Sequence, residues 1–207
     1  MFEPQVARFC VHWRCITGDQ RGQGRRAGDS IAAFSDYGMA NGLAALMKPL
    51  AIEHALFAGM SRRGYVALRR ALTHPRLVRG FVLYNTQTLP RDNAAIPSQK
   101  KMLAIWSQGG LSQRVAHNIA HIMLGDSTPQ AQAWKAMWNL WKPHNLMASF
   151  QARMERDDIP GCLGTIQVPA LVITRDAHTA TPVKRCLAMQ RHRAVRAWAS
   201  LREQTCK

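Results

Sequence analysis

The chain has few acidic residues and lacks any long apolar run. Its 207 residues include 28 Lys and Arg against 12 Asp and Glu, which gives a formal net charge of +16. Nowhere do about 18 apolar residues follow one another, as a helix that crosses a membrane would require. The first apolar stretch contains Arg8 and Arg14, so it does not fit a secretory signal peptide. These absences predict a cytoplasmic protein without a membrane partner.

Paired cysteines and metal-ligand patterns are also missing. The cysteines are odd in number and show no C-x-x-C spacing; they are Cys10, Cys15, Cys162, Cys186 and Cys206. His117 and His121 are four residues apart, but no third ligand and no H-E-x-x-H motif accompanies them. The sequence therefore predicts neither structural disulfides nor a metal site.

The excess of positive charge would suit a polyanionic partner such as nucleic acid. It falls into two separate segments, however: residues 41–90 hold seven Lys and Arg against one acid, and so do residues 183–207. No helix-turn-helix, zinc-finger or RNP-type motif accompanies these segments. We expect no specific nucleic-acid binding, and an acidic partner bound by residues 183–207 is the alternative to an enzyme.

What is present is the composition of a folded globular protein, with 47% apolar and 19% charged residues. Short apolar segments alternate with segments of helical spacing, which predicts an α/β sheet whose buried strands run parallel. Strands are expected over residues 10–17, 54–58, 78–84 and 170–174. Helices are expected over residues 37–50, over 65–73 and from 181 onward. Ser35 or Asp36 is expected to cap the first of these helices.

Between residues 97 and 154 the pattern indicates helices alone. We therefore predict a first core segment over residues 1–96, an inserted helical cap over 97–154, and a return to the core with a basic tail over 155–207. In the cap, Trp134, Trp138 and Trp141 share one helix face, either as core packing or as an aromatic lid.

Arginines are numerous in and after the second predicted helix. Arg69, Arg70, Arg76 and Arg79 are expected to form its solvated side and the entry to the next strand. The tail is expected to be a basic helix or disordered, because its apolar residues recur at partly helical spacing.

Ser61 stands in the sequence Gly-Met-Ser-Arg-Arg-Gly, between a predicted strand and a predicted helix. This pattern is close to the G-x-S-x-G nucleophile elbow, whose strained turn exposes a serine hydroxyl. A plain turn serine is the alternative. The flanking strand and helix favour a nucleophile.

With these residues the chain resembles α/β-hydrolases, especially the enol-lactonase and esterase branch. The likeness rests on DQRGQGR, FAGMSRRGYVALRRALTHPRLVRGFVLYNT, VPALVIT and TATP, which follow one another in the family's order over about residues 14–182. It implies a partial α/β-hydrolase fold, with a mostly parallel sheet flanked by helices and an inserted helical cap. It also implies hydrolysis of a small carboxylic ester or lactone without a cofactor.

The resemblance assigns roles to two neighbouring residues. Ser61 matches the nucleophile that attacks the carbonyl carbon, and the backbone N–H of Arg62 matches one donor to the oxyanion. A histidine base and an acid that orients it complete the family's set.

Several positions depart from the family pattern, so the catalytic set looks degenerate. Arg63 replaces a glycine of the elbow, which predicts a distorted turn. His178 occupies the place of the catalytic acid, and Asp176, two residues earlier, is the substitute candidate. No residue matches the family's histidine, since His192 lies in the basic tail. A truncated or frame-shifted gene product would explain these departures, and a homodimer could cover exposed sheet edges.

Overall fold

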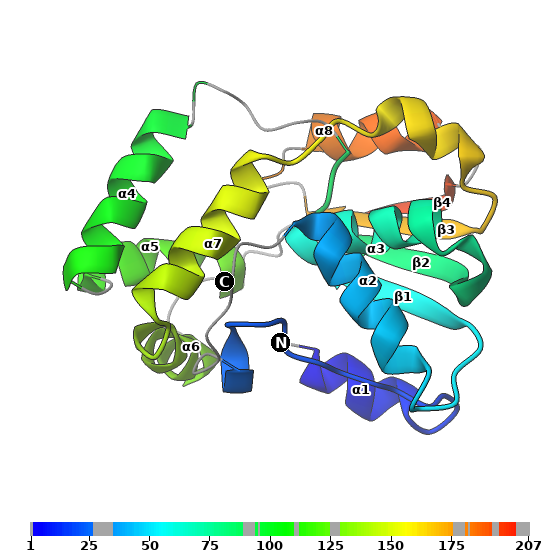
Figure 1. Ribbon diagram of the computed structural model, residues 1–207, viewed down its shortest axis with the longest axis horizontal. Helices are drawn as coiled ribbons and strands as arrows, with labels where there is room; N and C mark the ends of the chain where they lie inside the picture. The colour runs from blue at the N-terminus through cyan, green and yellow to red at the C-terminus, as the bar shows by residue number, and fades with distance from the viewer. Residues whose placement is uncertain are drawn as a thin grey trace.

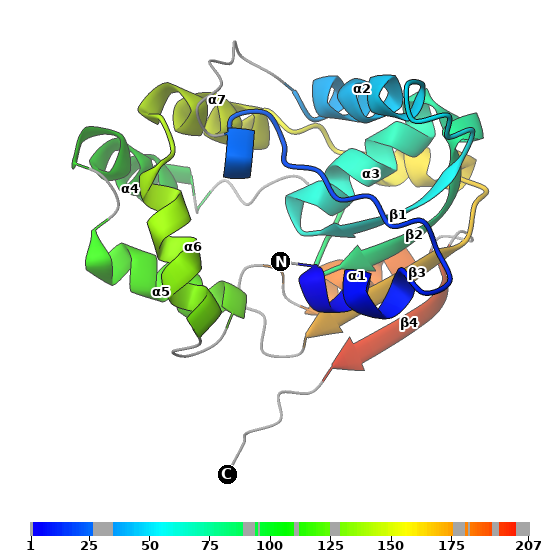
Figure 2. The same cartoon turned by 90° about the horizontal axis from the view of Figure 1, so that it is seen from below.

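A sheet with packed helices and a separate group of helices make up the protein (Figures 1 and 2). The computed structural model describes residues 2–26, 35–88, 94, 96–109, 112–124, 129–175, 181, 183–191 and 195–201. No helix within these ranges is both long and apolar enough to cross a membrane.

The sheet has four parallel strands in the order β1-β2-β3-β4. The strands are β1 (Ala55–Met60), β2 (Val78–Tyr84), β3 (Ala170–Arg175) and β4 (Val195–Leu201). Parallel strands need crossover connections, and here helices supply them. The predicted α/β architecture with a parallel sheet is therefore confirmed, and so are the strands expected near residues 54–58, 78–84 and 170–174.

Two predictions about the outer parts of the chain are wrong. The segment 10–17 forms no strand; it follows helix α1 (Glu3–Phe9), and Val11 and Trp13 in it are 74% and 62% exposed. This segment pairs with no strand among the described residues and is largely exposed. The tail is not one basic helix, because only α8 (Val183–Leu187) and a short 3-10 turn precede β4, which pairs with β3 along its length.

Helices α2 (Asp36–Met47) and α3 (Arg62–Thr73) stack on the sheet, α2 on α3 and α3 on β1 and β2. Ser35 caps α2 as predicted, since its Oγ accepts the N–H of Gly38 at 3.0 Å. The main core lies between α3, the sheet and the segment that leads to β3. Its buried side chains include Leu68, Phe81, Leu83, Ile159, Leu163, Val172 and Cys186.

Two arginines of α3 are buried, although they were expected to face solvent. Arg69 and Arg70 are 1% and 0% exposed because α2 covers this face of α3. Arg70 donates to the carbonyl of Ala40 at 2.8 Å and lies 5.2 Å above the ring of Phe57. Arg69 pairs with Asp157. The carboxylate of Asp157 offsets the desolvation of Arg69, whereas burial lowers the pKa of Arg70, whose Nε has no hydrogen-bond partner among the described residues.

Four helices follow one another between β2 and β3 and lie together to one side of the sheet in both views (Figures 1 and 2). They are α4 (Ile96–Gly109), α5 (Gln113–Leu124), α6 (Pro129–Asn139) and α7 (Pro143–Met154). Tryptophans build a second apolar cluster here: Trp106 stacks on Trp141 at 5.7 Å, and Trp134 meets Trp138 edge-on at 6.0 Å. These contacts favour core packing over an aromatic lid.

Candidate active site

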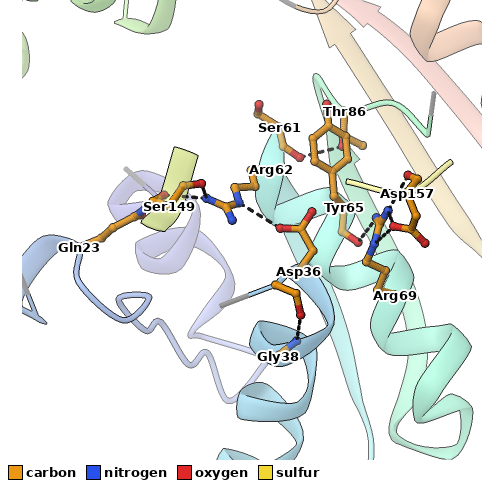
Figure 3. A network of polar contacts seen from close by, with 11 residues as sticks. Gln23, Asp36, Gly38, Ser61, Arg62, Tyr65, Arg69, Thr86, Ser149 and Asp157 are labelled. Carbon is orange, nitrogen blue, oxygen red and sulfur yellow. Dashed lines mark hydrogen bonds and ion pairs between the residues drawn. The ribbon is translucent and has the colours of Figure 1, made fainter. Parts of the chain in front are cut away.

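Ser61 lies in the sharp turn between β1 and α3 (Figure 3). Its backbone has φ 51° and ψ −119°, a region that residues other than glycine rarely adopt. The last residue of β2 and the segment after it hold this conformation: the N–H of Ser61 donates to the Tyr84 carbonyl at 2.9 Å, and Thr86 Oγ1 donates to the Ser61 carbonyl at 2.8 Å. Such strain persists where surrounding contacts over-determine it, often at functional sites.

Two glycines allow the close packing of this turn, because a side chain at either position would clash with neighbouring atoms. A Cβ on Gly59 would lie 2.7 Å from the carbonyl carbon of Arg63, and a Cβ on Gly64 would lie 2.5 Å from Oγ1 of Thr86. The close approach of α3 to the end of β2 therefore depends on Gly64, one position later than in the family pattern. Gly64 supplies this space with Arg63 in place.

The hydroxyl of Ser61 lies at the start of α3. It forms no capping bond to α3 and points away from the carboxylate of Asp36 (Figure 3). The residue lies at the N-terminus of a 12-residue helix, whose dipole favours negative charge at this end. Arg62 is the first helical residue, where a backbone N–H has no acceptor within the helix.

The side chain of Arg62 is enclosed by polar groups from three other segments (Figure 3). Its Nε donates to Asp36 Oδ1 at 3.1 Å, and its Nη1 donates at 2.7 Å both to the carbonyl and to the Oγ of Ser149 on α7. Gln23 adds a bond from its Nε2 to the same Oγ at 3.2 Å. Burial lowers the pKa of Arg62, while Asp36 acts in the opposite direction.

A second arginine lies near this group. The guanidinium of Arg156 lies 4.1 Å above the ring of Tyr65. Tyr65 is on α3, one helical turn after Arg62. Arg156 also adds to the positive potential that disfavours the charge on Arg62. Asp36 is the buried carboxylate of this neighbourhood, with its side chain 3% exposed.

The two remaining predicted site residues, Asp176 and His178, lie outside the described residues, as does His192. Of the described histidines, His54 contacts Arg79 and His74 contacts Thr73, and none bonds to Ser61. Within the same ranges, no group of three or more His, Cys, Asp or Glu side chains could hold a metal.

Sequence reasoning missed the polar network around Arg62. The bonded pairs of this network are Arg62 with Asp36, Arg62 with Ser149, and Gln23 with Ser149. They are 26, 87 and 126 positions apart along the chain, so no local spacing reveals them. The one available signal was an arginine directly after the serine of the elbow motif.

Curated proteins similar to this chain are carbamate hydrolases by their descriptions. A proposed carbamate hydrolase, RutD, of Yersinia enterocolitica is 36% identical over 85 residues, which are 41% of this chain and 31% of that protein. The counterpart of Serratia proteamaculans is 32% identical over 84 residues, again 41% of this chain and 32% of that protein. The match thus spans about a third of the relatives' length. No protein-family model matches the chain.

Solved structures match nearly the whole chain. An esterase from Thermogutta terrifontis has a TM-score of 0.84 at 21% identity, covering 97% of this chain and 75% of the esterase. The enol-lactonase from Burkholderia xenovorans has a TM-score of 0.82 at 20% identity, covering 97% and 76%. The chain therefore has an α/β-hydrolase fold that corresponds to three quarters of these enzymes, which confirms the fold implied by the sequence resemblance.

Proposed function

We propose that the protein is a hydrolase that cleaves a small carboxylic ester or lactone with Ser61 as the nucleophile. The backbone of Ser61 carries the proposal, because its strained turn presents a hydroxyl at the carboxyl end of β1 and at the positive end of α3. Ligands of open α/β sheets bind at this edge. The similar proteins, described as a proposed carbamate hydrolase, an esterase and an enol-lactonase, are all named for cleavage at an acyl carbon, which supports the same class.

The proposed reaction begins when Ser61 Oγ attacks the carbonyl carbon and gives its proton to a base. The backbone N–H of Arg62 donates to the oxygen that becomes negative in the tetrahedral intermediate. Collapse of the intermediate breaks the bond between the carbonyl carbon and the alcohol oxygen, which takes up the proton from the base, and leaves an acyl group on Ser61. Water then attacks this acyl group and gives one proton to the base, which returns it to Ser61 Oγ as the carboxylic acid leaves.

The acid of this reaction is a proposal on sequence grounds alone. Asp176 and His178 follow the last residue of β3, Arg175, by one and three positions, and both lie outside the described residues. We propose Asp176 as the acid, with His178, which occupies the family's acid position, as the alternative. The cap over residues 97–154, a cytoplasmic location and a homodimer likewise stay predictions.

The alternative, a non-catalytic remnant or basic interaction protein whose residues 183–207 bind an acidic partner, has less support. Residues 195–201 form β4 and are hydrogen-bonded to β3, so this part of the tail belongs to the sheet. As the edge strand, β4 pairs with β3 along one side, unlike a free basic segment. An ester hydrolase therefore fits the geometry better.

Turnover of short-chain aryl esters by purified protein tests the proposal. We expect Ser61→Ala to reduce the rate by at least about a thousandfold, because removal of the nucleophile leaves only oxyanion and binding effects. Ser107→Ala is the matched control, since this serine on α4 donates only to the carbonyl of Ala104, at 3.0 Å. Equal turnover by wild type and Ser61→Ala would refute the assignment.

A further inference from the structure

Helix α7 packs little against the sheet. Among the described elements, its extensive packing is against α4, which belongs to the same helical group. Polar contacts connect it to the core: Arg62 bonds to Ser149 near its middle, and Arg69 pairs with Asp157 just beyond its end. The position of α7 relative to the elbow therefore depends on a few directional bonds.

Arg62 occupies a special place among these contacts. Its backbone begins α3 directly after Ser61, and its side chain bonds to the start of α2 through Asp36 and to α7 through Ser149 (Figure 3). The side chain is only 13% exposed, so water screens these bonds little. One residue thus links the helical group, α2 and the turn that holds the nucleophile.

We propose that the Arg62 guanidinium is a tether that holds α7 at the nucleophile elbow and orients the Arg62 N–H toward the oxyanion. The second half of this inference rests on the proposed function. Arg62 acts here as a positioning residue through its side chain, and its backbone N–H is the group that touches the reacting atoms.

The chemistry of the side chain explains why arginine suits this role. A guanidinium presents several donors in a fixed plane, so Nε can face Asp36 while Nη1 faces Ser149. A lysine ammonium is a single point and cannot keep both partners at the same distances. Methionine has similar length and no donors, so it would leave Asp36 buried without its cation.

Hydrogen exchange followed by mass spectrometry tests the tether directly. We expect Arg62→Met to accelerate amide exchange in peptides from residues 143–154 by about tenfold to a hundredfold. This factor corresponds to the free energy that hydrogen bonds to a charged group usually contribute. Arg62→Lys should give a smaller acceleration. Arg79→Met is the matched control, because this exposed arginine on β2 contacts only His54, at 3.4 Å, and should leave the exchange of α7 unchanged.

Ser149→Ala provides a milder perturbation if Arg62→Met fails to fold. It removes the hydroxyl acceptor and keeps the carbonyl acceptor of the same residue. We expect faster exchange in residues 143–154 and unchanged exchange in β2. Unchanged exchange of α7 in Ser149→Ala and Arg62→Lys would overturn the tether.

The rate of Ser61 labelling by a small serine-reactive phosphonate tests the orienting role. We expect Arg62→Met to lower the labelling rate constant at saturating reagent about tenfold or more, with little change in half-saturating concentration and in final labelled fraction. A purely structural defect would instead lower the labelled fraction. Faster α7 exchange with an unchanged rate constant would overturn the proposal. A wild-type protein that takes no label would refute the proposed function, and α7 exchange would still decide on the tether.

Discussion

Alanine substitution at Gly64 should damage the elbow, although alanine is the better helix former. A Cβ at this position would lie 2.5 to 2.7 Å from three atoms of Thr86, whose side chain is 0% exposed and cannot move aside into solvent. Overpacking of this kind costs about 1–3 kcal/mol, and so severe an overlap favours the upper end. The gain in helix propensity returns about 1 kcal/mol. We therefore expect a net loss of about 2 kcal/mol in the free energy of unfolding.

Gly42 offers the matched control for this prediction. It lies inside α2, it is exposed, and a Cβ there would meet nothing within 4 Å. Gly42→Ala gains the same helix propensity without a clash, so we expect it to stabilise the protein by up to about 1 kcal/mol. Urea unfolding followed by circular dichroism measures both variants. Equal stabilities of the two variants would refute the close packing of α3 against Thr86.

Two further predictions concern polar contacts of α3 and α2. Asp157→Asn should destabilise the fold by about 2 kcal/mol, because it uncouples buried Arg69 from its carboxylate, a cost moderated by the 43% exposure of the Asp157 side chain. Burial raises the pKa of Asp157, but hydrogen bonds from Arg69 and Tyr37 outweigh this and lower it overall. The ionised Asp157 therefore contributes to the free energy of unfolding above the unfolded-state pKa, and this contribution is lost as pH falls through the folded-state pKa. Urea unfolding at several pH values should show that Asp157→Asn loses less stability in acid than the wild type. An identical pH profile would contradict this. Ser35→Ala should cost about 1 kcal/mol in the same assay, since it removes the α2 cap, and no change would contradict the cap.

The interior of the fold could be predicted from sequence because its signals are local. The run Val78–Tyr84 was recognised with its correct bounds, since a strand buried in a parallel sheet is a continuous apolar segment. The turn at Ser61 was found for the same reason: a short strand, a glycine-flanked serine and a helix follow one another within 20 residues.

The outer parts of the fold depend on contacts that spacing does not encode. The segment that forms β4 was expected to be helical or disordered, although Val195, Ala197, Ala199 and Leu201 alternate at the period of a strand. The arginine and tryptophan between them obscured the alternation. The burial of Arg69 could not be foreseen, because its partner Asp157 lies 88 positions away. Charged residues look solvated in a sequence until a distant counterion is known.

The central claim is that Ser61 is a nucleophile in an assembled site. Its most direct test is to treat the folded protein with a serine-reactive phosphonate and to map the adduct by peptide mass spectrometry. We expect one adduct on the peptide that contains Ser61, present in Ser107→Ala and absent from Ser61→Ala. A folded protein that carries no adduct, or carries one on another serine, would contradict the account.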